Sequence, residues 1–266
     1  MKNLSFDLNL ISAIEKSAGE YAWIFGDDDI LLDGALKKIL SIIDEYKPDY
    51  ISTNVYWWME SSGEKAIIKN KFHSKYMNKI SKNINNIDFE KLLNLRNIWF
   101  TFISSNIFRK NSLDLQIIKK EVNKLSKWSQ IEMVAQALSN KNGFITSKYC
   151  VAERTGKVRF NKITFLKLLP DAFEHVFSKF KVKKSTERYI YSGIRKEFLS
   201  FKSLLILKAK DGKVNYEDIS PKIVPSKIVC FYYRFLLLIV PTKLVIIAWK
   251  FKRFLNGKGF SVPKET

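Results

Sequence analysis

The spacing of apolar and polar positions predicts alternating helices and strands in the N-terminal part of the chain. Apolar residues recur with helical spacing over residues 6–14, and the continuous apolar run YAWIF at 21–25 predicts a short buried strand. A second helix is predicted from about residue 33 to 45, followed after Pro48 by a strand over 49–58. This order of elements is typical of an α/β fold.

The pattern continues through the middle of the chain. Asp88 is placed to cap a helix, and Gly143 to end one. The predicted elements are a polar loop or hairpin over 59–85, a helix in 88–99, a strand over 100–110, a helix over 127–140 and a pair of short strands in 143–154.

Beyond residue 160 the composition changes. Long amphipathic helices are predicted over 161–180 and 185–209, with Phe and Leu on one face and Lys on the other. The expected organisation is an α/β domain over residues 1–160, a helical extension over 161–220 and a separate tail over 221–266.

The tail is mostly apolar, but charged residues interrupt it. Arg234, Pro241 and Lys243 break the run, whereas a spanning helix needs about 20 consecutive apolar residues. From Lys222 onward the chain has nine basic residues and one acidic residue, Glu265. We expect a tail that lies on an anionic membrane surface, the alternative being a helical hairpin packed on the domain.

The net charge of +20 indicates an anionic partner, namely nucleic acid, a phosphorylated substrate or acidic lipid. No zinc-finger, helix-turn-helix or RNA-recognition pattern is present, so nucleic acid is not expected as the partner. Cys150 and Cys230 form no disulfide or zinc framework, which fits a reducing cytosol. The N-terminal apolar residues are interrupted by Asp7, Glu15 and Lys16, unlike a signal peptide.

Three consecutive aspartates, Asp27, Asp28 and Asp29, follow the predicted strand at 21–25. One interpretation is capping of the next helix by Asp29 or Asp33. Capping requires one carboxylate, whereas three adjacent ones repel each other. The other interpretation is a cation site at the carboxyl end of a strand, where α/β sheets bind ligands. With few histidines and no cysteine nearby, oxygen ligands favour Mg²⁺ or Mn²⁺.

The stretch DLNLISAIEKSAGEYAWIFGDDDIL resembles the central motif of family 2 glycosyltransferases of the GT-A fold, and its Gly-Asp-Asp-Asp form is similar to the abequosyltransferase-like subgroup. The resemblance extends over about residues 5 to 155. It implies a Rossmann-like domain, a nucleotide-sugar donor and an acceptor that is lipid-linked or a polysaccharide. In the family roughly 60–80 residues precede this motif, whereas 26 precede Asp27. A truncated GT-A domain lacking part of its nucleotide-binding half is therefore expected.

The resemblance also implies roles for individual residues. Asp27 and Asp29 match the outer positions of the D-x-D motif, with Asp29 on Mn²⁺ or Mg²⁺ and Asp27 on the metal or the ribose. Asp28 shares either role. The catalytic base of an inverting enzyme corresponds to Glu132, the only acid in KWSQIEMVAQAL. Ser104 and Ser105 are possible sugar contacts, the alternative being a buried strand with a polar edge.

The expected function is thus sugar transfer in bacterial surface polysaccharide synthesis, on the inner face of the cell membrane and peripheral to it. The alternative is an inactive remnant or a membrane-binding accessory protein.

Overall fold

The computed structural model describes residues 5–61, 64–68, 80–125, 128–155, 162–199 and 221–223. The chain divides into two compact units, the first formed by Met1–Phe160 with Asp171–Ile190 and the second by Asn161–Pro170 with Tyr191–Thr266. In the second unit the Arg195 guanidinium donates to the carbonyl of Ile223 at 3.1 Å.

The described residues form α-helices and strands with short 3₁₀ turns between them. In chain order they are α1 (Phe6–Lys16), β1 (Tyr21–Trp23), β2 (Ile30–Leu31), α2 (Ala35–Tyr46), β3 (Tyr50–Ser61), β4 (Glu64–Ile68), β5 (Ile84–Ile87), α3 (Phe89–Arg96), η1 (Asn97–Thr101), η2 (Ile103–Ser105), β6 (Asn106–Arg109), η3 (Lys110–Ser112), α4 (Leu115–Leu125), α5 (Ser129–Ala137), β7 (Gly143–Thr155), α6 (Lys162–Lys179), α7 (Lys184–Phe198) and η5 (Pro221–Ile223).

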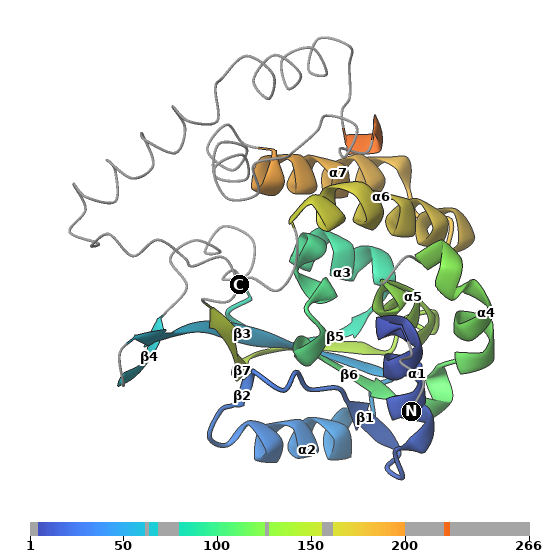
Figure 1. Ribbon diagram of the computed structural model, residues 1–266. Helices are drawn as coiled ribbons and strands as arrows, with labels where there is room; N and C mark the ends of the chain where they lie inside the picture. Colours follow the sequence, from blue (N-terminus) through green and yellow to red (C-terminus); the bar gives the residue numbers. More distant parts are fainter. Residues whose placement is uncertain are drawn as a thin grey trace, which may run out of the picture. The chain divides into compact units, whose positions relative to one another are not determined.

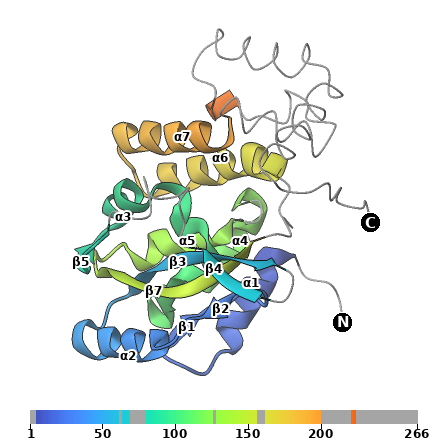
Figure 2. The ribbon, with the colours of Figure 1, turned by 90° about the vertical axis from the view of Figure 1, so that its left-hand side faces the viewer.

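The first unit is built on one mixed sheet. Its strands run in the order β1-β6-β3-β7-β2, with β4 paired to β3 and β5 paired to β7. β3 and β7 are parallel, and the remaining pairs are antiparallel. Helix α2 lies on one face of the sheet, and α3 and α5 lie on the other (Figures 1 and 2). The expected α/β class is confirmed.

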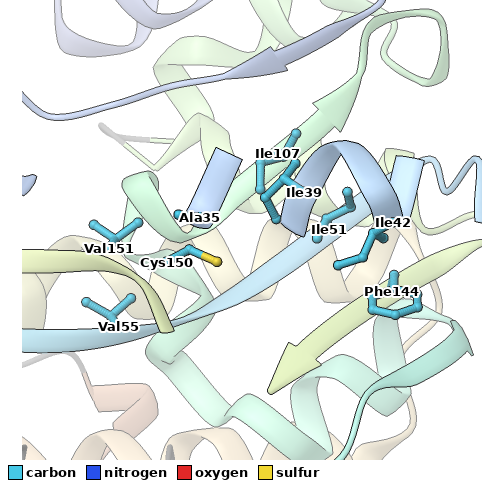
Figure 3. Packing of buried hydrophobic residues seen from close by; sticks show 9 residues of the cluster. All are labelled: Ala35, Ile39, Ile42, Ile51, Val55, Ile107, Phe144, Cys150 and Val151. Carbon is cyan, nitrogen blue, oxygen red and sulfur yellow. The ribbon is translucent and has the colours of Figure 1, made fainter. Parts of the chain in front are cut away.

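The face of the sheet toward α2 is apolar (Figure 3). Ile39 and Ile42 project from α2 onto Ile51 of β3, and each of the three is at most 2% exposed. Burying an isoleucine side chain contributes about 1.5–3 kcal/mol before conformational entropy is subtracted. This packing fixes the start of α2, and with it the segment that connects β1 to α2.

The opposite face of β3 carries polar residues. Tyr50 is fully buried and donates from its hydroxyl to Oδ1 of Asn106 at 2.6 Å. Above this face, Phe89 of α3 contacts Phe100, and Phe100 contacts Phe173 of α6 in edge-to-face geometry. The sheet therefore has one apolar face and one face with a buried polar layer under aromatic cover.

Most predicted elements of this unit are confirmed, including α1, β1, α2, β3, α3 and α5. The expected hairpin after residue 59 is present as the β3–β4 pair. Two predictions differ from the structure. The predicted strand over 100–110 is confirmed only for β6 (Asn106–Arg109) and is preceded by 3₁₀ turns, and the predicted pair of strands over 143–154 is the single strand β7.

Local hydrogen bonds explain the first of these differences. The hydroxyl of Thr101 donates to the carbonyl of Ile98 at 2.7 Å, and that of Ser105 donates to the carbonyl of Phe102 at 2.7 Å. Such bonds from side chain to nearby backbone compete with the ladder of a sheet. In β7 a shift of register beside Asn54 bends the strand without ending it.

Helix α4 was not foreseen, although its buried Ile118 and Leu125 have helical spacing. No helix among the described residues has the length and apolar character needed to cross a bilayer. The predicted membrane-surface tail, apart from residues 221–223, lies outside the described residues, and the expected domain boundaries remain a prediction.

Candidate functional site

The three aspartates lie in a tight turn between two strands of the sheet. β1 ends at Trp23, and the backbone N–H of Asp29 donates to the carbonyl of Gly26 at 3.2 Å, which closes the turn. Immediately afterwards β2 pairs with β7. The carboxylates are thus held between two points of attachment to the sheet, and we call residues 26–29 the acidic turn.

The capping interpretation is wrong for this turn. Helix α2 begins after Gly34, which adopts a left-handed conformation with φ of 71° and makes no side-chain cap. No acidic residue occupies the first turn of α2. The N-cap position belongs to Gly34 and not to Asp29 or Asp33, so capping of α2 does not account for the cluster of carboxylates.

A buried serine holds the last of the three aspartates. Ser104, which is fully buried, donates from its hydroxyl to Oδ2 of Asp29 at 2.5 Å and accepts from the N–H of Gly26 at 2.9 Å. Its own carbonyl accepts from the indole N–H of Trp23 at 2.9 Å. One residue of η2 therefore fixes both ends of the acidic turn and the end of β1.

Gly26 lets two carboxylates approach the backbone closely. A Cβ at this position would lie 2.7 Å from Oδ2 of Asp29 and 3.4 Å from Oδ1 of Asp28. The first distance is shorter than a real contact and the second is ordinary packing. The carboxylates of Asp28 and Asp29 therefore gather over Gly26, whereas Asp27 is exposed to solvent.

The donor atoms of the acidic turn fit a hard divalent cation. They are carboxylate oxygens on adjacent residues, and Mg²⁺ and Mn²⁺ prefer such ligands and keep coordination positions open for phosphate oxygens. Among the described residues no group of three or more His, Cys, Asp or Glu side chains is placed to hold a metal. A cation here would therefore depend on one or two carboxylates and on oxygen atoms of a ligand.

Glu132, the candidate base, is placed differently. It is fully buried in α5, where its Oε1 accepts from Nζ of Lys179 at 2.7 Å and from the Gln136 amide at 3.0 Å. Its Oε2 has no hydrogen-bond partner within the described residues. Lys179 also donates to Glu121 at 2.7 Å. Glu132 thus takes part in an ion-pair cluster that joins α4, α5 and α6.

The other serine suggested as a sugar contact is also committed to the fold. Ser105 is buried, and its hydroxyl donates to the carbonyl of Phe102.

Two features of the structure were not assigned from the sequence. Ser104 appeared as a possible sugar contact, whereas its hydroxyl is committed to Asp29 and Gly26. Arg96 was not singled out at all, although it is 1% exposed. The sequence signal for Arg96 is weak, because an arginine at the end of a helix ordinarily interacts with the helix dipole at the surface.

Comparison with known proteins gives distant structural similarity. No protein-family model and no curated protein matches the chain. The crystal structure of S. aureus TarS 1–349 is similar over 94% of this chain and 71% of that chain, with 13% identity and a TM-score of 0.45. Its complex with UDP-GlcNAc covers 94% and 72% with 15% identity and a TM-score of 0.41.

A longer S. aureus TarS structure matches over 91% of this chain and 42% of that chain, at 15% identity and a TM-score of 0.46. Similarity at this level identifies no equivalent residues.

Proposed function

We propose that this chain is a glycosyltransferase of the GT-A type, or a portion of one, that transfers a sugar from a nucleotide-sugar to a lipid-linked or polysaccharide acceptor. The observation that carries the proposal is the acidic turn, with Asp28 and Asp29 gathered over Gly26 at the end of β1. The resemblance of residues 7–31 to family 2 glycosyltransferases, in the abequosyltransferase-like subgroup, supplies the reaction class.

In an inverting transfer the acceptor oxygen bonds to the anomeric carbon while the bond to the diphosphate breaks. The electron pair leaves with the diphosphate, and the acceptor proton passes to a carboxylate base. Asp29 and Asp27 are the residues that would hold Mn²⁺ or Mg²⁺, and Asp28, whose carboxylate lies beside that of Asp29 over Gly26, would share this role. The bound ion would neutralise charge on the diphosphate. Ser104 acts as a positioning residue, since it orients Asp29.

Glu132 is the candidate base from the sequence, and its burial favours a second candidate function. A carboxylate paired with Lys179 and shielded from solvent does not face an acceptor in this structure. A chain that binds a nucleotide-sugar or its diphosphate without transferring the sugar is therefore the second candidate. Both candidates require the acidic turn, and only the first requires a working base.

The acidic turn is tested by titrating the full chain with Mn²⁺ and UDP or UDP-GlcNAc, which S. aureus TarS binds in crystal structures of its two complexes, and measuring affinity by calorimetry. Asp29→Asn is expected to weaken Mn²⁺-dependent binding at least about tenfold. Asp33→Asn, an exposed aspartate just beyond the turn, is the matched control for the loss of one negative charge. Equal affinities of the two variants would refute the assignment.

Release of UDP from UDP-GlcNAc then separates the two candidates. Release that requires Asp29 supports the transferase, and binding without release over hours supports the second candidate.

A further inference from the structure

Arg96 is a buried cation on the polar face of the sheet. It is the last residue of α3, is 1% exposed, and is the largest of the fully buried side chains among the described residues. Arginine is rarely buried to this extent without a carboxylate partner, because removing the charge from water costs several kcal/mol. The partners of its guanidinium therefore decide what holds it there.

Among the described residues, only one of the three guanidinium nitrogen atoms has a hydrogen-bond partner. Nη1 donates to Oδ1 of Asn54 at 2.6 Å, and the Asn54 amide in turn donates to the carbonyl of Ser147 at 2.8 Å. Nε and Nη2 are buried and have no hydrogen-bond partner in the described part of the chain. No ion pair between described residues includes Arg96.

The two unpartnered nitrogen atoms, Nε and Nη2, indicate which kind of ligand group could bind to Arg96. Nε and Nη2 carry parallel N–H groups on one edge of the planar guanidinium, and this edge binds two oxygen atoms of a carboxylate or phosphate at once. The adjacent residue, Asn97, is also buried and has an unpartnered side-chain donor, Nδ2. Two consecutive residues thus have buried donors with no partner among the described residues, and the acceptor that matches the Nε and Nη2 edge is an oxyanion.

Two tyrosines influence the guanidinium. Tyr50 and Tyr149 both interact electrostatically with Arg96, and burial lowers the pKa of Arg96 to about 10. Tyr149 is half-buried and stacks on Tyr56 with ring centroids 3.9 Å apart and planes within 2°. Tyr149 pairs with Asn54 at the shift of register between β3 and β7, an irregularity that often lies near functional sites.

We propose that the Nε and Nη2 edge of Arg96, beside Asn54 and Tyr149, binds an oxyanion of a ligand, either a phosphate or a carboxylate. This site is built from α3, β3 and β7, and it stands whether or not the acidic turn binds a metal.

The test uses the full chain and two probes, inorganic phosphate and acetate, each compared with chloride at equal ionic strength and pH. Thermal unfolding and calorimetry measure binding to wild type, Arg96→Met, Arg96→Lys and Arg188→Met. Arg188 is exposed, so its substitution removes one positive charge from the surface and is the control for nonspecific binding to a basic protein.

Wild type and Arg188→Met are expected to be stabilised by one of the probes, which identifies the class of oxyanion. Arg96→Met should lose this shift and, without a probe, unfold at the same or a higher temperature, since an unpaired buried charge is removed. Arg96→Lys should bind about tenfold more weakly, because an ammonium lacks the two-pronged edge.

Any one of three results would overturn the proposal. These are that neither probe stabilises wild type, that Arg96→Met keeps the full shift in unfolding temperature, or that Arg96→Lys binds the probe as tightly as wild type. If Arg96→Met does not fold, Arg96→Lys alone decides.

Discussion

Ser104 is the residue on which the geometry of the acidic turn depends. Replacing it with alanine removes the hydrogen bond to Asp29 and leaves the Gly26 N–H without its partner. We expect Ser104→Ala to lower the free energy of unfolding by about 1–3 kcal/mol and to weaken Mn²⁺ binding at least about tenfold, because the Asp29 carboxylate loses its orientation. Urea unfolding and Mn²⁺ titration measure the two effects.

Ser105→Ala is the matched control for Ser104→Ala. Ser105 is 2% exposed and its hydroxyl bonds only to the carbonyl of Phe102 among the contacts described, so its loss affects stability by a similar mechanism. It does not contact an aspartate. If both variants weaken Mn²⁺ binding equally, Ser104 has no special role at the acidic turn.

The sequence predicts the carboxylates of the acidic turn, but not the residue that holds Asp29 in place. Asp27, Asp28 and Asp29 stand out as three adjacent like charges after an apolar run. Ser104 lies 75 residues beyond Asp29, and only the pairing of β1 with β6 brings its hydroxyl to that carboxylate. A contact of this kind depends on sheet topology, which hydrophobic periodicity does not specify.

Charged side chains as well as apolar ones join helices α4, α5 and α6. Lys179 of α6 donates to Glu121 of α4 and to Glu132 of α5, both at 2.7 Å. Burial alone would lower the pKa of Lys179, but these two hydrogen bonds outweigh burial and raise it. At the start of α5, Asp7 of α1 accepts from the N–H and hydroxyl of Ser129. The first turn of α5, which contains Ser129 and Glu132, is thus fixed by contacts of carboxylates.

This cluster predicts a pH dependence of stability. Burial opposes ionisation of Glu121, but the hydrogen bond from Lys179 and the His175 imidazole at 3.3 Å outweigh it and lower the pKa of Glu121 below its ordinary 4.5. Its contribution to stability is fully present above that value and is lost as the pH falls through the lower folded-state pKa. Glu121→Gln should therefore destabilise the chain by about 1 kcal/mol at pH 7 and by progressively less below pH 4.5.

Urea unfolding from pH 3 to pH 7 measures this difference. Asp44→Asn, which changes an exposed acid on α2, should differ little from wild type at every pH. A difference between wild type and Glu121→Gln that stays constant down to pH 3 would rule out the ion-pair explanation.

A helix or strand is predictable from the sequence where its hydrophobic periodicity agrees with its contacts in the fold. α1 and α2 have clear helical spacing and are present where it predicts them. The segment from Phe100 to Asn106 has strand-like alternation, but its hydroxyls bond to nearby carbonyls. The Asn106 amide also donates to two carbonyls, those of Phe100 and Phe102, at 2.8 Å. Such side-chain bonds stabilise turns in a sequence that looks extended.

At the scale of the whole molecule, the net charge of +20 is unevenly distributed along the sequence. The tail from Lys222 to the C-terminus contributes nine basic residues and one acidic residue, 9 − 1 = +8 of that total. Its apolar residues and basic flanks match an anionic membrane surface, where each Lys or Arg contributes about 1 kcal/mol. The acceptor proposed above is lipid-linked or a polysaccharide, so a tail on the membrane would bring the acidic turn to it.

The tail is tested in the full chain by replacing Lys250, Lys252 and Arg253 with glutamine and measuring binding to vesicles with and without anionic lipid. We expect binding to anionic vesicles to fall at least about tenfold, since about 1 kcal/mol is lost for each charge. A control variant neutralises three exposed lysines of the described fold, Lys37, Lys120 and Lys141, and therefore has the same net charge.

If binding depends on the tail, the control retains most of it, and a chain that ends at residue 220 loses it altogether. Equal losses in the two triple variants would mean that total charge, and not the tail, attracts the protein to the membrane. Tighter binding to DNA than to anionic vesicles at the same salt concentration would instead indicate a nucleic-acid partner. DNA and anionic vesicles both attract a basic protein electrostatically, and only the preferred partner retains the protein as the salt concentration increases.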